Sequence, residues 1–329
     1  MGEVAARANV SESTVSRVLS NANVSIAPET CKLVRRVAAE LGYQPNKAAR
    51  ALATGRTQTV ALWTTNLRSV FYAEVVFYIN QEVTKHGYEL MVNYLRTVDN
   101  TSLNTHHLLS WPFDGILAVD LPRSEIHGLE GSLVEAKPIV NVGAYVITTT
   151  DYVRVDFRNA TIEAVHHLAS VGCRRIAYLV PDWFEWFEAI DDDRLVGYRS
   201  GVADIGREPE YIVTRDESEG AVEAKVRDYI KKHGCPDGLF CYNDDMAIIV
   251  YQVLQDLGIR IPQDVAVIGC NGTRETRILT PQLSTIVQPI EKMCAVAWSF
   301  LEKRIGDPKI PLQHHVIPAV CEFRGSTKR

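Results

Sequence analysis

The chain has 329 residues, of which 46% are hydrophobic and 23% charged, and its formal net charge is −5. This length exceeds what one hydrophobic core usually serves, so it predicts two or more domains of an ordinary globular protein. No apolar run approaches the ~20 residues that span a bilayer, and residues 1–10 lack the features of a signal peptide, so we expect a cytoplasmic protein without a membrane partner.

Charge is distributed unevenly along the chain. Residues 1–58 contain eight basic and four acidic residues, a net charge of +4, whereas the remainder contains 27 basic and 36 acidic residues, a net charge of −9. A basic head on an acidic body is typical of a nucleic-acid-binding module joined to a sensor. Chance variation in a short window can give the same numbers, so charge alone does not decide the function.

Three short helical patterns fill residues 1–45. The first covers Glu3–Ala8, the second covers Glu12–Leu19 behind the capping residue Ser11, and the third starts at Pro28 and stops at Gly42. Only residues 9–11 connect the first two patterns, which predicts a helix-turn-helix corner.

The second helix, "ESTVSRVL", has two chemically distinct faces. Its apolar residues share one face, and Ser13, Ser16 and Arg17 share the opposite one. Short hydroxyls fit a DNA major groove, where Arg17 can donate two hydrogen bonds to one guanine. The alternative is a solvated face of a small helical bundle, for which Ser and Thr are poor helix formers.

Residues 46–58 form a short segment between the head and the body. Asn46 is placed to cap a helix that runs to about Ala53, and Gly55 is placed to close it. Because Leu52 is its only large apolar residue, this helix is expected to be marginal in isolation.

From Thr59 onward, strand-like and helical stretches alternate in two series, as in "TVALWT" before "VFYAEVVFYINQEVTKHGY" and "RIAYLV" before "LVGYRSGVADIG". Such series predict two parallel-sheet, Rossmann-like lobes that bind ligands beyond the carboxyl ends of their strands. These lobes would also suit the solute-binding protein of a sugar transporter, which the basic head and the missing signal peptide disfavour.

Metal and catalytic motifs are missing from the sequence. The seven cysteines form no CxxC pair and no cluster with histidine, which is typical of buried thiols in a reducing compartment. There is no GxGxxG after a strand, no P-loop and no GxSxG elbow. We therefore expect no enzyme, no cofactor and no metal.

Seven stretches follow one another along the chain: "VSESTVSRVLSN", "ELGYQPNKAARALATGRTQTVAL", "GYRSGV", "NDDMAI", "LGIRIPQDVAVIG", "TPQLSTIVQPIEKM" and "EFRGST". In this order they resemble the LacI/GalR family of bacterial transcription repressors. The resemblance implies a helix-turn-helix domain (1–45), a hinge helix and linker (46–58), and a core like the type I periplasmic binding proteins. The N-terminal core lobe would comprise residues 59–157 and 288–316, and the C-terminal lobe residues 158–287 and 317–329.

The resemblance also implies a function. The protein is expected to be a repressor whose affinity for double-stranded operator DNA is controlled by a small, carbohydrate-like effector bound between the lobes. A homodimer is expected, because tetramers of the family use an added C-terminal helix and this chain ends at "STKR". Family members usually carry several residues, including a capping Ser or Thr, before the position of Gly2, so a misassigned or truncated start is an open alternative for this chain.

Carried over position by position, the resemblance implies two sets of binding residues. The DNA-binding set is Glu12, Ser13, Thr14, Ser16, Arg17, Asn46, Lys47, Arg50 and Leu52. The effector-binding set is Asn66, Phe71, Tyr72, Trp183, Arg194, Asn243 and Asn271. Leu52 would wedge between base pairs in the minor groove, or alternatively pack between hinge and core.

Arg194 would bind ligand oxygens, or alternatively form an ion pair with Asp191, Asp192 or Asp193. Asp244, next to Asn243, is expected to cap the helix that follows it.

Two departures from the family bear on the ligand. Asn66 and Asn271 stand where sugar-binding members carry carboxylates that clamp sugar hydroxyls. We therefore expect a less negative cleft and a sugar or sugar derivative, with an anionic group as an option for Arg194 to pair. The aromatic loop around Trp183 suits a sugar ring and a planar heterocycle equally.

Overall fold

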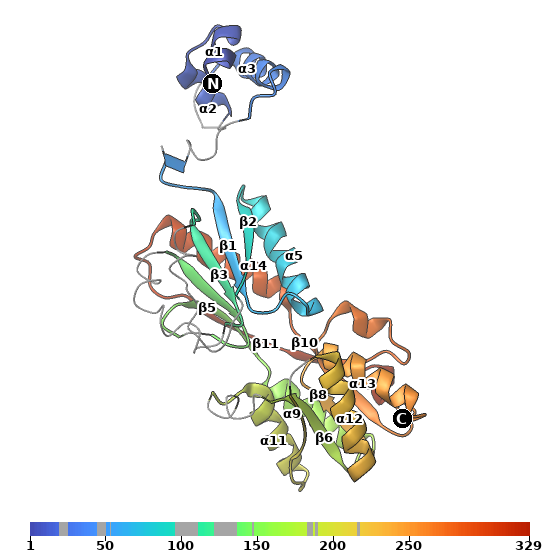
Figure 1. Ribbon diagram of the computed structural model, residues 1–329. Helices are drawn as coiled ribbons and strands as arrows, with labels where there is room; N and C mark the ends of the chain where they lie inside the picture. Colours follow the sequence, from blue (N-terminus) through green and yellow to red (C-terminus); the bar gives the residue numbers. More distant parts are fainter. Residues whose placement is uncertain are drawn as a thin grey trace. The chain divides into compact units, whose positions relative to one another are not determined.

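The computed structural model describes residues 1–19, 26–44, 51–52, 54–95, 111–121, 137–146, 148–182, 187, 190–215 and 218–329. The chain divides into a head unit, Met1–Gln58 with Pro112–Asp114, and a core unit, Thr59–Trp111 with Gly115–Arg329 (Figure 1). Each unit has its own hydrophobic core. Within the described ranges, no helix is both long enough and apolar enough to cross a bilayer.

The head unit contains three helices, α1 (Gly2–Ala8), α2 (Glu12–Leu19) and α3 (Pro28–Glu40). Asn9 adopts a left-handed conformation after α1, and Ser11 Oγ accepts a hydrogen bond from the backbone N–H of Thr14 at 3.2 Å, as a capping residue does. Small apolar side chains fill the core between the helices: Val4, Ala5, Ala8, Val15, Val18, Val34, Val37 and Ala38. The three helices predicted from the sequence are therefore confirmed.

Asp114 fixes the last residues of the linker. Its carboxylate accepts hydrogen bonds from Thr57 N and Thr57 Oγ1, both at 2.8 Å, and from Gln58 N at 2.9 Å. These bonds satisfy the donors of the chain directly before β1. Most of the helix expected over residues 46–54 lies outside the described residues.

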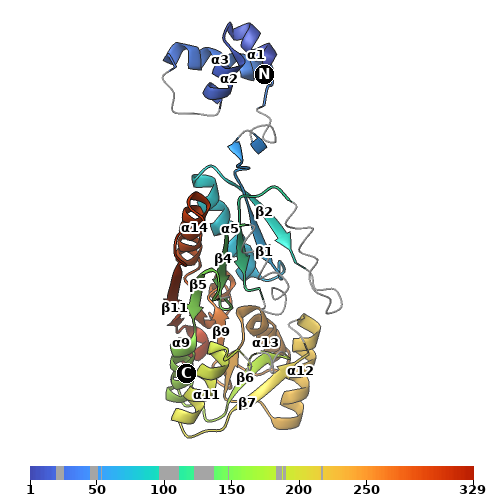
Figure 2. The same ribbon diagram turned by 90° about the vertical axis from the view of Figure 1, so that its left-hand side faces the viewer.

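The first sheet of the core unit has the strand order β11-β5-β4-β3-β1-β2, and all its pairings are parallel. Its strands are β1 (Thr59–Thr64), β2 (Glu89–Tyr94), β3 (Gly115–Val119), β4 (Ile139–Gly143), β5 (Asp151–Asp156) and β11 (His314–Pro318). Helices α5 (Val70–Lys85) and α14 (Ile290–Gly306) pack against it (Figure 2).

The second sheet has the order β12-β10-β9-β8-β6-β7 and is parallel except for the pairing of β12 with β10. Its strands are β6 (Ile176–Pro181), β7 (Glu210–Thr214), β8 (Gly238–Cys241), β9 (Ala266–Asn271), β10 (Ser284–Val287) and β12 (Val320–Glu322). Its helices are α9 (Arg158–Ser170), α11 (Asp193–Asp204), α12 (Glu219–His233) and α13 (Asp244–Asp256), with short 3₁₀ turns at Arg274–Arg277 and Gly325–Thr327.

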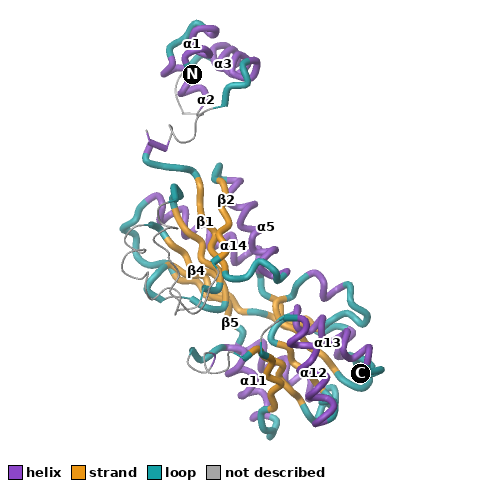
Figure 3. The backbone as a smooth tube through the Cα atoms, in the orientation of Figure 1, coloured by secondary structure: helices purple, strands orange, loops and turns teal. Residues whose placement is uncertain are grey.

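The chain passes between the two sheets three times, after β5, after β10 and after β11. In Figure 3 the strands of both sheets appear in orange and the helices beside them in purple. The expected fold class is confirmed: an all-α head precedes an α/β core with two parallel-sheet lobes, here called the first and the second lobe.

Helices α9 and α11 approach closely because α11 carries glycines on the contacting face. A Cβ atom at Gly197 would lie 2.6 Å from the backbone oxygen of Arg158 and 2.8 Å from Thr161 Cβ. At Gly201 a Cβ would lie 2.8 Å from Val165 Cβ. Neither position accepts a side chain unless the helices separate.

We predict that Gly197→Ala lowers the free energy of unfolding by about 1–3 kcal/mol, because the added methyl group overpacks the α9–α11 contact. Gly220 in α12 has no described atom within 4 Å of the place a Cβ would take. Gly220→Ala should therefore be neutral or stabilise the protein by up to about 1 kcal/mol. Urea unfolding of both variants measures the difference, and equal effects would contradict the packing argument.

Candidate functional site

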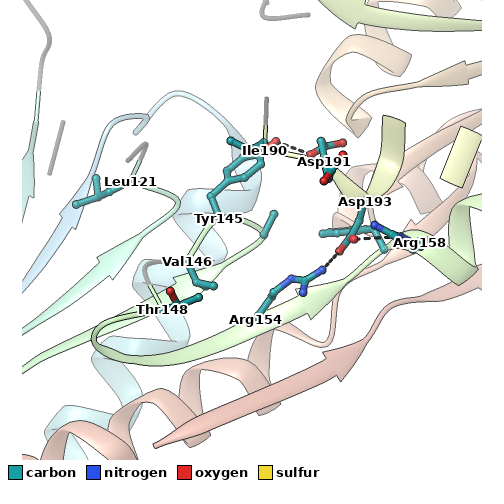
Figure 4. Close-up of a pocket in the computed structure, with 12 residues that line it drawn as sticks. Leu121, Tyr145, Val146, Thr148, Arg154, Arg158, Ile190, Asp191 and Asp193 are labelled. Atoms are coloured by element: carbon teal, nitrogen blue, oxygen red, sulfur yellow. Dashed lines mark hydrogen bonds and ion pairs between the residues drawn. The ribbon is translucent and has the colours of Figure 1, made fainter. Parts of the chain in front are cut away.

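A pocket of about 370 Å³ lies between the two lobes of the core unit, near the start of α11 (Figure 4). Its lining is Leu121, Ala144, Tyr145, Val146, Thr148, Arg154, Phe157, Arg158, Ile190, Asp191, Asp192 and Asp193. Residues 121, 144–146 and 148 follow strands of the first sheet, whereas residues 190–193 lead into a helix of the second lobe. Both lobes therefore contribute to the pocket.

Asp192 has two tasks in this lining. Its Oδ1 accepts hydrogen bonds from the backbone N–H groups of Arg194 and Leu195, both at 3.0 Å, so Asp192 is the N-cap of α11. Its Oδ2 accepts from the Tyr145 hydroxyl at 3.0 Å and lies 3.4 Å from Arg194 Nη2. One carboxylate thus both begins the helix and orients the arginine.

Arg194 is almost completely buried behind this lining, with 4% of its surface exposed. Its guanidinium carbon lies 4.0 Å from the ring centroid of Tyr242 and 5.0 Å from that of Phe157. Nη2 donates to the hydroxyl oxygens of Tyr145 at 2.5 Å and Tyr242 at 3.0 Å. Among the described residues, Nε has no hydrogen-bond acceptor. This nitrogen is itself buried, so the guanidinium is connected to the pocket lining through Nη2.

The turn after β4 places Tyr145. Asp120, in a left-handed conformation with φ 46°, accepts at Oδ1 from Ala144 N at 2.7 Å and from Tyr145 N at 3.2 Å. Its carboxyl fills the space beside Gly143, where a Cβ would lie 2.2 Å from Oδ1. Burial raises the pKa of Asp120 to about 6. Burial also raises the pKa of Tyr145 well above its usual value, so its hydroxyl keeps the proton that it donates to Asp192.

An ion-pair cluster forms another part of the lining, as Figure 4 shows. Asp193 bonds Arg154 Nη2 through Oδ2 and lies 3.6 Å from Arg158 Nε through Oδ1. Asp191 beside it is exposed. Three carboxylates therefore line the pocket, Asp191, Asp192 and Asp193, whereas we expected a less negative cleft from the sequence. Within the described ranges, no group of three or more His, Cys, Asp or Glu could hold a metal ion.

The three expected effector asparagines use their side-chain oxygens for local bonds. Asn66 Oδ1 accepts from the backbone N–H groups that lead into α5, at 2.9 and 3.3 Å. Asn243 Oδ1 accepts from the backbone of Met246 at 2.8 Å and so caps α13. Asn271 Oδ1 accepts from Gln288 Nε2 at 2.8 Å.

The expectation that Asp244 caps α13 was wrong. Its carboxylate instead accepts hydrogen bonds from Thr285 Oγ1 and from the backbone N–H of residue 273.

The other expected effector residues are spread more widely. Phe71 is buried in the core, and Tyr72 is half-buried with its ring 5.0 Å from that of Phe71. Trp183 lies outside the described residues. None of the expected residues lines the pocket directly, and Arg194 is connected to it through Tyr145 and Asp192.

Sequence reasoning missed Asp120, Tyr145, Arg154 and Tyr242. Asp120, Tyr145 and Tyr242 each follow the end of a strand, which was the available signal.

On the head unit, α2 presents its polar face to solvent. Glu12, Ser13, Ser16 and Arg17 are exposed, whereas Thr14 is half-buried and its Oγ1 lies 2.8 Å from Ser11 Oγ. Leu52 is 90% exposed, although it is a large apolar side chain. Asn46, Lys47 and Arg50 lie outside the described residues.

We predict that Asp120→Asn removes a pH dependence of stability. A folded-state pKa near 6, above the ordinary 3.8, means that the stability from the protonated carboxyl is full below pH 4 and is lost as pH rises through 6. Asparagine keeps the Oδ1 acceptor and tolerates the left-handed backbone. The variant should therefore gain roughly 1–2 kcal/mol over the wild type at pH 7, because two pKa units are worth about 3 kcal/mol and solvent screens part of that.

Chemical unfolding at pH 4, 5.5 and 7 measures this gain, with Asp191→Asn in the same pocket as the control. A gain at pH 7 that persists unchanged at pH 4 would contradict a titrating Asp120.

Comparison with known proteins adds to this geometry. Residues 1–46 match the family model described as "Bacterial regulatory proteins, lacI family", and residues 165–327 match a "Periplasmic binding protein-like domain". Catabolite control protein A of Priestia megaterium is 31% identical over 334 residues, covering 99% of this chain and 98% of the relative. The protein of the same name from Staphylococcus epidermidis is 28% identical over 339 residues, with the same coverage.

Solved structures agree over the same extent. The transcriptional regulator CelR in complex with cellobiose superposes with a TM-score of 0.69 at 26% identity, covering 98% of both chains. The lac repressor dimer bound to operator and the anti-inducer ONPF has a TM-score of 0.83 at 22% identity, covering 98% of this chain and 97% of the repressor, and shows the same fold. The chain belongs to the lacI family of bacterial regulatory proteins.

Proposed function

We propose that this regulator is a transcription repressor that reads operator DNA with α2. A sugar-like effector held beside Arg194 lowers or raises its affinity for the operator. The observation that carries the DNA-reading part is the exposed face of α2. Its short polar side chains and Arg17 face solvent while Val15 and Val18 anchor the helix in the head core. Such a face enters a major groove without steric hindrance.

The proposed DNA contacts fall into three groups. Glu12, Ser13, Thr14, Ser16 and Arg17 read base edges or nearby phosphates, and the linker residues Asn46, Lys47 and Arg50 contact the backbone. Leu52 enters the minor groove, and its 90% exposure supports this role over packing.

The proposed effector is a neutral, polyhydroxylated molecule. Among the described residues, the three arginines at the pocket already have carboxylate partners: Arg194 is paired with Asp192, and Arg154 and Arg158 with Asp193. A hydroxyl group can donate to such a carboxylate and accept from its arginine, whereas an anion would have to displace the carboxylate. The complex of the related CelR with cellobiose supports a carbohydrate.

Asn66, Phe71, Tyr72, Trp183, Asn243 and Asn271 remain proposed effector contacts. The side-chain oxygens of the three asparagines already accept hydrogen bonds within the protein, so these residues would donate to a ligand through Nδ2.

We also propose a cytoplasmic homodimer without catalytic activity. Large apolar side chains are exposed on the core unit, including Phe77 of α5 at 56% and Ile278 at 80%, and a second copy of the chain would cover them.

The proposed domains are residues 1–45, residues 46–58 and the two core lobes. Because β11 extends to Pro318, we set the last boundary between the lobes after residue 318 rather than 316.

We predict that Arg17→Ala weakens operator binding by roughly 1–3 kcal/mol and relaxes the preference at one base pair per half-site, because a bidentate contact to guanine is lost. Gel shifts on the DNA upstream of the protein's own gene and on random DNA test the function. Arg36→Ala removes another exposed arginine, from α3, and should leave the ratio of the two affinities unchanged. Equal losses on both DNAs for Arg17→Ala would refute base reading.

We predict that Leu52→Ala reduces operator affinity and DNA bending, yet changes the free energy of unfolding by less than about 0.5 kcal/mol, because the side chain is exposed. A circular-permutation gel shift measures the bend. Leu67→Ala, at a 44% exposed leucine of the core unit, is the control and should leave the bend unaltered. An unchanged bend with Leu52→Ala would exclude the wedge.

A further inference from the structure

We propose that the Tyr145 hydroxyl competes with the effector for Arg194 and Asp192, and that its bonds latch the two lobes together. This inference rests on the proposed effector site, and it names the residue that controls access to that site. Neither the sequence pattern nor the family resemblance pointed to Tyr145.

The hydrogen bonds of Tyr145 are those that a sugar hydroxyl would make. Its oxygen accepts from Arg194 Nη2 at 2.5 Å and lies 2.8 Å from the Tyr242 hydroxyl, and its proton goes to Asp192 Oδ2 at 3.0 Å. A hydroxyl group has one donor and two acceptor sites, so this pattern uses all of them. An effector hydroxyl that bonds Nη2 and Oδ2 in this geometry must take the place of the phenol.

The same bonds join the lobes. Tyr145 follows β4 of the first sheet, whereas Asp192, Arg194 and Tyr242 belong to the second lobe. Asp120 holds the turn of Tyr145 from within the first lobe, through Ala144 N and Tyr145 N. A ligand that displaces the phenol therefore removes direct hydrogen bonds between the lobes.

Two other connections limit the size of the effect. Arg154 of β5, in the first lobe, forms an ion pair with Asp193 of α11, in the second lobe. The carboxylate of Asp245, in the first turn of α13, interacts with Ser69 and with the backbone of Val70 at the start of α5. The lobes therefore stay connected when Tyr145 leaves. Loss of the Tyr145 bonds should weaken the contact between the lobes rather than separate them.

Tyr145→Phe tests the proposal because it removes only the competing oxygen. Tyr242→Phe is the matched control: it also removes a phenol oxygen bonded to Arg194, but one from the same lobe, while its ring still covers the guanidinium. The probe is phenylglyoxal, which labels accessible arginines, with labelling of Arg194 followed by mass spectrometry of the corresponding peptide.

We expect Arg194 in Tyr145→Phe to be labelled about three- to tenfold faster than in the wild type, the factor that corresponds to one net hydrogen bond. The rate in Tyr242→Phe should rise less. Equal rates in Tyr145→Phe and the wild type overturn the proposal, and so does a larger increase in Tyr242→Phe. The melting temperatures of both variants show that they are folded.

A second arm uses cellobiose as the ligand in a thermal-shift titration. Tyr145→Phe should bind it about three- to tenfold more tightly than the wild type, whereas a purely structural role of Tyr145 would weaken binding. If the wild type binds neither cellobiose nor other neutral sugars, the proposed effector class fails, while the phenylglyoxal rates still decide whether Tyr145 blocks Arg194.

Discussion

A parallel sheet buries both of its faces, and this constraint determines where polar side chains can lie in the core of this regulator. Strands β3, β4, β6 and β9 are buried along their whole length. Several polar side chains lie where strands end: Asp120 after β3, Tyr145 after β4, Asn243 after β8 and Asn271 at the end of β9. The pocket beside Arg194 is thus a consequence of the topology, since the turns of one sheet meet the start of a helix from the other lobe.

Burial of Arg194 imposes a second requirement on these turns. A guanidinium removed from water is destabilising unless its charge and its donors are matched. Asp192 supplies the charge, two tyrosine hydroxyls accept from Nη2, and aromatic rings cover the flat faces. Under the proposed function, the contacts that stabilise the folded arginine are the contacts that an effector would have to replace, so stability and effector binding would be in opposition at this point.

The sequence was most informative where its signals are local. The cap at Ser11, the start of α3 at Pro28 and the alternation of strands and helices each depend on residues close together in the chain, and each was predicted. The pairing of Tyr145 with Arg194 joins residues 49 positions apart, and no periodicity reports such a pair. Local rules also failed at Asn243 and Asp244, because either residue can cap a helix. Contacts of Asp244 with Thr285 and residue 273 decided which one does.

The double use of Asp192 has an evolutionary consequence. One of its oxygens begins α11 and the other holds the arginine and the phenol, so almost any replacement would impair folding and ligand response together. Tyr145 starts no helix, and its own turn is held by Asp120 through backbone groups. Under the proposed function, a substitution at position 145 in evolution would change the sensitivity to the effector and leave the start of α11 intact, whereas one at position 192 would disturb both.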